Sequence, residues 1–203
     1  MTYILATDEA GYGTLAGDLV VAGVLAPLDW VPPRGVKDSK KLSRDDLEGF
    51  YRVLLADHRI RHFIHRTPPE EIDRAGAYQA LRTAHQAVHQ QLGEKAQGVV
   101  KHIADGNLEL GNGIHSIPKA DANYPACSAA SILAKVTQVR AMRELDKLHP
   151  GYGFRSHCGY GTPEHEMALA RLGPCPAHRR SYAPVRKLLQ PNSDDDLEGF
   201  LPR

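Results

Sequence analysis

Short apolar runs alternate along the chain with longer stretches in which apolar residues recur at helical spacing. The first two runs cover residues 3–8 and 17–28, and the connection between them, residues 9–16, is short and rich in small residues. A parallel crossover needs about a dozen residues or more, so this connection predicts an antiparallel pair of strands. Further strands are expected at residues 59–66, 98–104 and 113–118.

The rest of the chain contains residue patterns that are typical of helix starts and helix ends. Ser43-Arg44-Asp45-Asp46 resembles a capping box. Thr67-Pro68-Pro69-Glu70 begins an Ala-rich stretch that runs to Leu92, with Gly93 as the stop signal. The longest predicted helix runs from Ser128, with Lys135, Arg140 and Arg143 off its apolar stripe, and the last begins at Thr162-Pro163 and ends at Gly173-Pro174. The order β-β-α-β-α-α-β-β-α-α predicts an α/β fold, a mixed five-stranded sheet flanked by helices, with helices at the C-terminal end.

Composition suits one domain with a short appendage. The chain has 203 residues, with 25 Lys and Arg against 24 Asp and Glu, which excludes a highly basic histone-like protein and a polyacidic disordered chain. Residues 1–190 are expected to form the domain, and residues 191–203 a flexible acidic tail. The tail holds one Arg against four acidic residues, so the body holds 24 basic residues against 20 acidic ones.

The cysteines and the apolar runs indicate the compartment. Cys127, Cys158 and Cys175 are odd in number and lack CxxC spacing, which argues against a disulfide framework and a zinc site. The apolar run Leu19–Leu28 is about half as long as a membrane span, and no export signal is expected at the N-terminus. A cytoplasmic protein without a membrane segment is therefore the expectation.

Four acidic residues stand where predicted strands end or connections begin. They are Asp8, Glu9, Asp105 and Asp121. Strand ends that converge at one edge of an α/β sheet form the usual reactive crevice. Clustered carboxylates raise one another's pKa unless cations neutralise them, and two Mg²⁺ or Mn²⁺ ions about 4 Å apart would support displacement at a phosphate. Taken singly, each aspartate could instead be an ordinary turn residue, as Asp-Gly-Asn often is.

The glycines at positions 11, 13 and 17 do not form a dinucleotide-binding motif. Their spacing is G-x-G-x-x-x-G, and an apolar β-rich run follows where that motif requires a helix. No P-loop pattern occurs in the sequence. The backbone of this connection could still approach a phosphate or a ribose hydroxyl closely, because glycine has no side chain.

Six ordered motifs make the chain resemble the ribonuclease HII family from Thr2 to about Leu188. They are residues 8–17 (DEAGYGTLAG), 38–43 (DSKKLS), 105–107 (DGN), 128–137 (SAASILAKVT), 150–162 (PGYGFRSHCGYGT) and 178–185 (HRRSYAPV). The resemblance implies an RNase H-like fold. It also implies endonucleolytic cleavage of RNA in RNA–DNA hybrids, or in DNA duplexes with embedded ribonucleotides. The cut falls on the 5′ side of a ribonucleotide and leaves 3′-hydroxyl and 5′-phosphate ends.

The resemblance also assigns roles to individual residues. The family's metal-binding acidic positions fall on Asp8, Glu9, Asp105 and Asp121, which implies a two-metal site for Mg²⁺ or Mn²⁺. The junction-sensing tyrosine falls on Tyr160, whose alternative is a surface aromatic in a Gly-rich turn. The expected substrate-binding residues are Gly11, Tyr12, Gly13, Ser39, Lys40, Lys41, Tyr160, Arg179 and Arg180. The lysines and arginines of this set would hold phosphates, or else form a solvated basic face.

Four positions depart from the family pattern. Tyr12 stands in Gly-Tyr-Gly where Gly-Arg-Gly is usual, Asp18 where an uncharged residue is common, Ala120 where glycine precedes the aspartate, and Cys158 where lysine is common. These changes remove two cations near the substrate path and add an anion. They motivate a second hypothesis, a hybrid-binding relative with weakened or lost junction-specific cleavage. A third, a metal-dependent hydrolase of small substrates, leaves Lys40, Lys41 and Tyr160 without a role.

The expected partner is nucleic acid, bound by a monomer. The tail offers one further partner, because Asp194, Leu197, Phe200 and Leu201 have the spacing of a clamp-binding peptide. The tail lacks the usual glutamine and second aromatic residue of such peptides, so a disordered end is the preferred interpretation.

Overall fold

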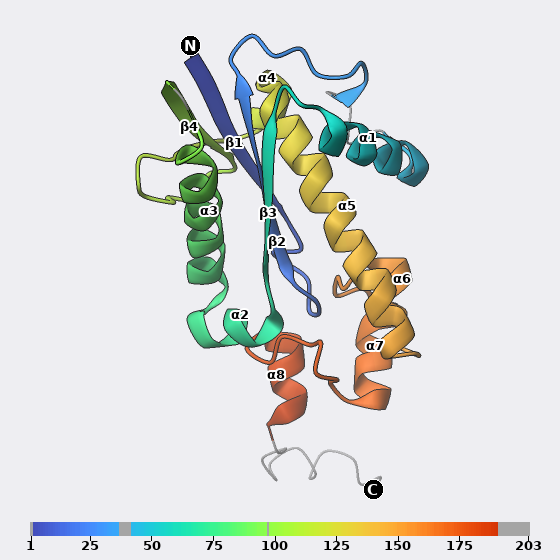
Figure 1. Ribbon diagram of the computed structural model, residues 1–203. Helices are drawn as coiled ribbons and strands as arrows, with labels where there is room; N and C mark the ends of the chain where they lie inside the picture. Colours follow the sequence, from blue (N-terminus) through green and yellow to red (C-terminus); the bar gives the residue numbers. More distant parts are fainter. Residues whose placement is uncertain (1, 37–41, 97, 191–203) are drawn as a thin grey trace, which may run out of the picture.

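The fold is built on one mixed five-stranded sheet, as the sequence predicts. The computed structural model describes residues 2–36, 42–96 and 98–190 (Figure 1). The strands are β1 (Thr2–Ala10), β2 (Leu19–Pro27), β3 (Arg61–Thr67), β4 (Val99–Asp105) and β5 (His115–Ile117), in the spatial order β3-β2-β1-β4-β5. The β1–β2 and β2–β3 pairs are antiparallel, whereas β1–β4 and β4–β5 are parallel. The predicted antiparallel pairing of the first two strands is confirmed.

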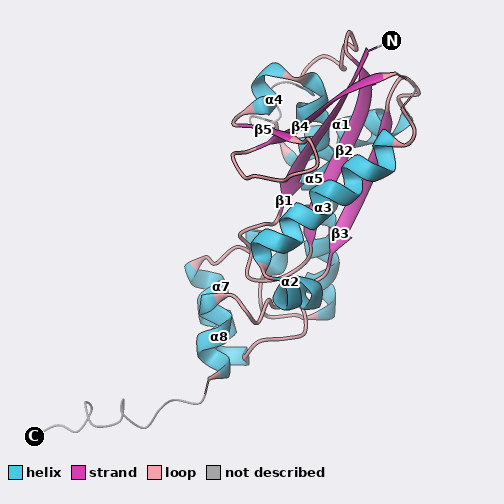
Figure 2. Ribbon diagram, turned by 90° about the vertical axis from the view of Figure 1, so that its left-hand side faces the viewer, coloured by secondary structure: helices cyan, strands magenta, loops and turns pink. Residues whose placement is uncertain are grey.

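Helices cover both faces of the sheet. They are α1 (Arg44–Ala56), α2 (Pro69–Ala75), α3 (Ala77–Gly93), α4 (Ala120–Asn123), α5 (Pro125–Leu148), α6 (Phe154–His157), α7 (Pro163–Leu172) and α8 (Ala183–Leu189). Helix α5 lies on one face, with α1 beside it, and α3 lies on the other (Figures 1 and 2). Helices α6, α7 and α8 gather at the end of the molecule opposite the N-terminus (Figure 1).

Strand β2 lies inside the sheet, between β3 and β1, and its sequence is apolar on both faces. Every residue from Leu19 to Ala26 is buried. Val20 and Val24 pack into the core under α5, whereas Val21 and Leu25 pack into the core under α3. A continuous Val- and Leu-rich run is typical of a strand that has helices on both sides.

Small residues let both covering helices approach the sheet closely. Ala126, Ala129 and Ala130 of α5 are buried in the core on its face. On the other face, a Cβ atom added to Gly23 would lie 2.3 Å from Cγ1 of Val88 in α3. A side chain at position 23 would therefore push α3 away from the sheet.

The helix boundaries agree with the sequence in part. The capping box is confirmed, since Ser43 Oγ accepts a hydrogen bond from the Asp46 N–H at 3.2 Å and the Asp46 carboxylate accepts one from the Ser43 N–H at 3.4 Å. The Ala-rich stretch divides into α2 and α3 at Gly76, whose φ of +82° is incompatible with a helix. Helix α5 begins at Pro125, three residues before the predicted start.

Two groups of predicted functional residues lie outside the described part of the chain. These are Ser39, Lys40 and Lys41, and the tail of residues 191–203. The expectations about phosphate binding and clamp binding at these positions stay predictions. Among the residues that the structure describes, no helix has the length and apolar character needed to cross a membrane.

Candidate active site

Two parallel strands bring the first carboxylates together. Thr7 of β1 pairs in register with Ala104 of β4, so the next residues, Asp8 and Asp105, come near the carboxyl ends of two neighbouring strands, although β1 itself continues to Ala10. Asp8, Glu9 and Asp105 line one cavity of about 270 Å³ together with Asn107, Gly106, Pro118 and Lys119. The sequence places these acids at strand ends, and the parallel register places them at the same edge of the sheet.

The alternation of side chains along β1 separates its two acidic residues. Asp8 shares a face with Ala6 and points toward α5, where Ser131 donates a hydrogen bond to its carboxylate. Glu9 shares the opposite face with Leu5 and Thr7, and its Oε2 lies 3.4 Å from Nε2 of His85 in α3. The two carboxylates therefore reach the strand end from opposite sides of the sheet.

The environment of Asp8 favours its uncharged form. Burial and the negative charges of Glu9 and Asp105 raise the pKa of Asp8 to about 7, against the lowering effect of the Ser131 hydrogen bond. Like charges that share a low-dielectric site cannot all ionise without a counter-charge. A bound cation would supply that charge, so Asp8 is arranged as expected for a metal ligand.

Asp105 and Asp121 are held by the turn that leads into α4. The Asp105 carboxylate accepts hydrogen bonds from the backbone N–H groups of Ala120 at 2.7 Å and Gly106 at 3.1 Å. Asp121 follows directly and is buried, and its carbonyl accepts a hydrogen bond from Ser128 Oγ. Burial raises the pKa of the Cys127 thiol, and the charges of Asp8, Asp105 and Asp121 raise it further. Three of the predicted metal ligands therefore act electrostatically on the same buried thiol.

The acids open onto a larger cleft with cations at its rim. This cleft has a volume of about 700 Å³. Its lining includes Asp8, Glu9 and Asp105 together with the exposed side chains of Arg44, Lys135 and Tyr160. A cavity of this size fits a nucleotide-sized group. Within the described residues, no group of three His, Cys, Asp or Glu side chains is arranged closely enough to hold a metal ion, and Asp121 lines neither this cleft nor the smaller cavity.

The connection between β1 and β2, residues 11–18, contains three glycines and is called the glycine connection below. The side chain of Arg179 fixes it from inside the protein. This guanidinium is fully buried and donates hydrogen bonds to the carbonyl oxygens of Gly11 at 2.6 Å, Tyr12 at 2.8 Å and Gly17 at 2.9 Å. The prediction that Arg179 holds a phosphate directly is therefore wrong, because its donors are used inside the protein. Arg180 has an exposed side chain and its backbone N–H donates to Asp73, so this residue keeps its predicted role as a candidate.

Other glycine-connection residues have clear positions. Gly11 has a φ of +82°, and a Cβ atom there would lie 2.9 Å from the Asp18 carbonyl oxygen, whereas Gly13 has open space around it. The Tyr12 ring packs on the α3 side of the sheet and lines a cavity of about 220 Å³ with Glu9 and Leu81. The carboxylate of Asp18 forms an ion pair with Arg66 at 2.7 Å, so the expected added negative charge is compensated.

Tyr160 lies at the rim of the large cleft, on the loop between α6 and α7, whose backbone is held by several hydrogen bonds. Its side chain is 44% exposed, and its carbonyl oxygen is the partner of the buried His165 Nδ1 at 2.8 Å. The Gly159 N–H donates to His157 Nδ1 at 3.2 Å, and the Gly159 carbonyl accepts from the Leu15 N–H at 2.7 Å. The backbone of this loop is thus joined to the glycine connection.

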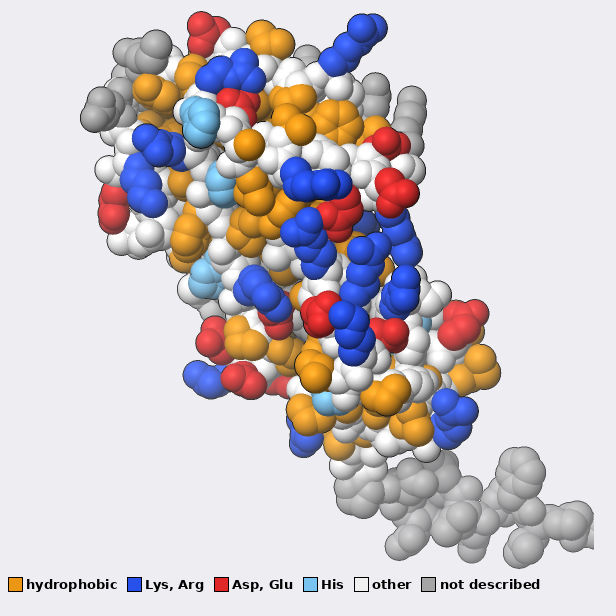
Figure 3. Space-filling model, turned by 45° about the vertical axis from the view of Figure 1, so that its right-hand side comes forward, with side chains coloured by type: hydrophobic (Ala, Val, Ile, Leu, Met, Phe, Trp, Pro, Cys, Tyr) orange, Lys and Arg blue, Asp and Glu red, His pale blue; other side chains and the backbone are white. Residues whose placement is uncertain are grey.

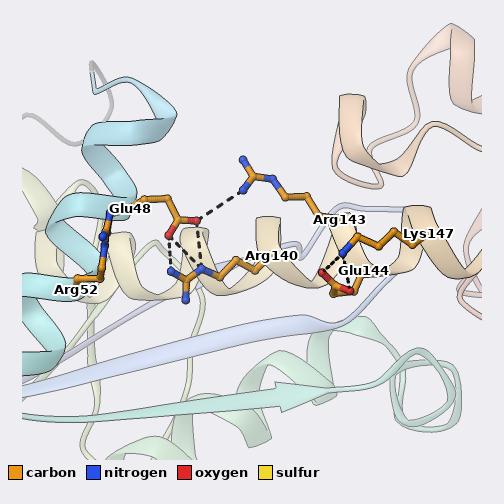
Figure 4. A network of polar contacts seen from close by, with 6 residues as sticks. All are labelled: Glu48, Arg52, Arg140, Arg143, Glu144 and Lys147. Atoms are coloured by element: carbon orange, nitrogen blue, oxygen red, sulfur yellow. Dashed lines mark hydrogen bonds and ion pairs between the residues drawn. The ribbon is translucent and has the colours of Figure 1, made fainter.

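Basic side chains gather over the face that carries α1 and α5 (Figure 3). Figure 4 shows Glu48 of α1 paired with Arg140 of α5, while Arg143 lies 3.8 Å from the same carboxylate. The Arg140 hydrogen bond lowers the pKa of Glu48 below its usual range. The predicted helical spacing already places Lys135, Arg140 and Arg143 off the apolar stripe of α5. The sequence did not identify Arg44 and Lys135 as site residues, although both line the cleft.

Comparisons with known proteins agree with this architecture. The family model described as "Ribonuclease HII" matches residues 5–185. A ribonuclease HII of Polynucleobacter asymbioticus is 40% identical over 193 residues, which cover 94% of this chain and 97% of that protein. One of an Anaeromyxobacter species is 42% identical over 189 residues, covering 93% of this chain, and the chain spans 59% of that relative's length.

Solved structures share the fold. The RNase HII in the PCNA:RNase HII complex of Archaeoglobus fulgidus superposes with a TM-score of 0.72 at 26% identity, covering 95% of this chain and 99% of that one. Bst-RNase HIII, solved in complex with Mn²⁺, superposes with a TM-score of 0.68 at 18% identity, covering 93% and 69%. The match across residues 5–185, together with the RNase H-like sheet and its strand-end acids, shows that this chain belongs to the ribonuclease HII family of type 2 ribonuclease H hydrolases.

Proposed function

We propose that this protein is a divalent-cation-dependent endonuclease that cleaves the RNA strand of RNA–DNA hybrids on the 5′ side of a ribonucleotide. The products carry 3′-hydroxyl and 5′-phosphate ends. The observation that carries this proposal is that Asp8 and Asp105, the residues after the last register pair of β1 and β4, line one cleft with Glu9 and that the pKa of Asp8 is raised to about 7 there. Membership of the ribonuclease HII family supports the substrate class.

The donor set fits hard divalent cations. Asp8, Glu9, Asp105 and Asp121 would hold Mg²⁺ or Mn²⁺, since carboxylate oxygens are the ligands that these ions prefer. The Mn²⁺ complex of the RNase HIII with the same fold supports this choice. When bound, two such ions lower the pKa of an attacking water and stabilise the charge on the departing oxygen. No three of the described His, Cys, Asp or Glu side chains are arranged closely enough to hold an ion, so the support for this site is the chemistry of its donors.

The cleft residues Arg44, Lys135 and Tyr160 would bind and orient the substrate together with Arg180 and the glycines, which lie outside the cleft lining. The backbone at Gly11 and Gly13 can approach the ribose closely, and Arg179 fixes that backbone from inside the protein. Lys135, Arg44 and Arg180 are exposed cations that would contact phosphates and so set the register of the duplex. Tyr160 presents its ring at the rim of the cleft, where it would stack on a sugar or a base.

Removal of divalent cations tests the proposal. Protein treated with a chelator is expected to leave a duplex with one embedded ribonucleotide uncut, and added Mg²⁺ or Mn²⁺ is expected to restore cleavage. Gel mapping of the products should place the cut 5′ of the ribonucleotide, and a long RNA–DNA hybrid assayed in parallel reports the substrate preference. Cleavage that persists in chelator, or fragments that end in a 2′,3′-cyclic phosphate, would contradict the proposal, because such ends arise when the 2′-hydroxyl itself attacks the phosphate.

A second candidate, a hybrid-binding relative with weakened junction-specific cleavage, rests on Tyr12. The Tyr12 ring packs toward Leu81, so the tip of the glycine connection carries no cation. A Tyr12→Arg variant is expected to raise kcat/KM on the single-ribonucleotide duplex about fivefold, because one well-placed phosphate contact contributes roughly 1 kcal/mol. Steady-state kinetics on both substrates measure this gain, with Tyr12→Phe as the control that adds no charge. Equal rates for Tyr12→Arg and the parent protein would remove this candidate.

A further inference from the structure

A line of buried polar side chains runs from Glu9 away from the cleft, between the sheet and α3. His85 Nδ1 lies 2.8 Å from Thr7 Oγ1, which lies 3.1 Å from His89 Nε2, and His89 Nδ1 lies 2.9 Å from His102 Nδ1. At the other end, His85 Nε2 lies 3.4 Å from Glu9 Oε2. Thr7, His85 and His89 are at most 4% exposed.

The elements of the fold explain why these residues meet. His85 and His89 are four residues apart, so they share one face of α3. Thr7 and Glu9 are two residues apart and share one face of β1, and His102 lies on the adjacent strand β4. The rest of this interface is apolar, with Leu81, Val88 and Leu92 buried around it. Polar groups in such surroundings are costly unless each has a hydrogen-bond partner.

The chemistry of the groups selects one direction for the hydrogen bonds. A neutral imidazole has one donor and one acceptor nitrogen, and the Thr7 hydroxyl has one proton to donate. A carboxylate oxygen can only accept, so the 3.4 Å contact between His85 Nε2 and Glu9 Oε2 favours the tautomer of His85 that carries its proton on Nε2. The Thr7 hydroxyl has two acceptors in reach, the Ile103 carbonyl oxygen at 3.4 Å and His85 Nδ1 at the shorter distance of 2.8 Å, and we assign its proton to His85. Thr7 then accepts from His89 Nε2–H, and His89 Nδ1 accepts from His102 Nδ1–H.

The opposite direction leaves two acceptors facing each other at Glu9. It would place the lone pair of His85 Nε2 against the carboxylate oxygen at 3.4 Å, which is repulsive. Burial and the neighbouring His102 and His85 rings lower the pKa of His89 to about 3, so this ring is neutral at physiological pH, as the assignment requires. At the far end, His102 borders an outer cavity of about 400 Å³, where its second nitrogen can meet water.

Glu9 depends on this contact for its orientation. Its side chain is 27% exposed, and within the described part of the chain His85 is the side chain paired with its carboxylate. Asp105, by contrast, is fixed by two backbone N–H groups. Residues that donate to metal-binding carboxylates orient them, and their loss typically weakens metal binding about 10- to 100-fold.

We propose that His85, itself oriented by Thr7, His89 and His102, is a positioning residue that holds the Glu9 carboxylate in its cation-binding orientation. This inference rests on the proposed function, in which Glu9 is a metal ligand. The contact from His85 Nε2 is with Oε2, which would leave Oε1 of the same carboxylate for a cation.

Titration of the whole protein with Mn²⁺, without nucleic acid, tests this inference by calorimetry. His85→Leu is expected to weaken Mn²⁺ binding about tenfold, whereas His85→Gln, which keeps an N–H donor at a similar reach, should stay within about threefold of the parent protein. Leu92→Ala, at the far end of α3, is the control for general destabilisation: it should lower the melting temperature and leave the Mn²⁺ affinity unchanged. Mn²⁺ binding by His85→Leu that equals that of the parent would overturn the inference.

A second pair of variants separates orientation from folding. Thr7→Val keeps the shape of the side chain and removes the hydroxyl that orients His85, so it should weaken Mn²⁺ binding about threefold or more. Combined with His85→Leu it should add no further loss, since both changes act through one contact. If His85→Leu fails to fold, Thr7→Val decides: Mn²⁺ affinity equal to that of the parent overturns the inference.

Asp105→Asn separates the existence of the metal site from the positioning role of His85. If this variant binds Mn²⁺ as the parent protein does, the proposed metal site itself is wrong. If Asp105→Asn loses Mn²⁺ while His85→Leu and Thr7→Val keep it, the metal site stands and the positioning role of His85 is wrong.

Discussion

An Asp8→Asn variant is expected to lose kcat/KM by about 10³-fold or more and yet to be more stable than the parent protein at pH 8 without divalent cations. The loss of activity follows from the removal of a charged group from the reacting centre, where single substitutions commonly cost that much. The gain in stability follows from the crowding of Asp8 by burial and by the charges of Glu9 and Asp105. An amide at this position carries no charge to be buried.

The pH dependence of this effect has a definite sign. The pKa of Asp8 is about 7 in the folded protein, whereas an aspartate in an unfolded chain has a pKa of 3.8. For a carboxyl group with a raised pKa, the stabilising contribution is complete below pH 3.8 and is lost as the pH rises through about 7. The difference between the two pKa values corresponds to roughly 4 kcal/mol as an upper bound. The melting temperature of Asp8→Asn should therefore exceed that of the parent by more at pH 8 than at pH 5.

Asp105→Asn is the matched control for this prediction. It should lose cleavage to a similar degree but gain no stability, because the Asp105 carboxylate accepts hydrogen bonds from the Gly106 and Ala120 N–H groups. Added Mg²⁺ should raise the melting temperature of the parent at pH 8 and have little effect on Asp8→Asn. A melting temperature of Asp8→Asn at or below that of the parent at pH 8 would contradict the argument.

Replacing Arg179 with methionine is expected to lower the free energy of unfolding by about 3–5 kcal/mol, as the loss of one member of a buried polar network does. Methionine fills much of the same volume but leaves the carbonyl oxygens of Gly11, Tyr12 and Gly17 without their donor. Each buried carbonyl without a partner costs roughly 1–3 kcal/mol. Burial lowers the pKa of Arg179, and removing this buried charge offsets part of the loss. Urea unfolding followed by circular dichroism measures the difference.

Two control variants separate the role of Arg179 from that of a surface cation. Arg179→Lys should be intermediate in stability, because one ammonium group cannot reach all the carbonyls that the planar guanidinium bonds. Arg180→Met should unfold like the parent, since the Arg180 side chain is exposed and Asp73 accepts from its backbone N–H, which the substitution keeps. Unchanged stability of Arg179→Met would show that the buried guanidinium is not needed to hold the glycine connection.

The sequence predicts the features that depend on neighbours along the chain. Strand positions, the capping box at Ser43 and the acids at strand ends all follow from local spacing and from the conformational preferences of a few residues. The same reasoning gave the α/β architecture, because short and long connections allow different strand pairings. The predicted order has two helices between the third and fourth strands, but the break between them at Gly76 was not placed, although glycine offered a signal for it.

Contacts between residues far apart in the sequence determine the roles of several side chains that the sequence alone could not assign. Arg179 looks like a phosphate-binding cation in a basic cluster, but it hydrogen-bonds Gly17, 162 residues away, and is buried by that contact. Asp18 looks like an added negative charge, but β3 supplies Arg66 as its partner. His85 gives no signal at all in the sequence, since its environment depends on how α3 lies across β1.

The sequence by itself therefore determined the type and order of the elements, the RNase H-like fold through its ordered motifs, and the acids of the candidate site. The tertiary structure alone decided which charges are free to meet a substrate and which are used to hold the protein together. The physical reason is that a side chain's spacing along the chain fixes the face it occupies, whereas its burial and its partners depend on which distant segment packs against that face.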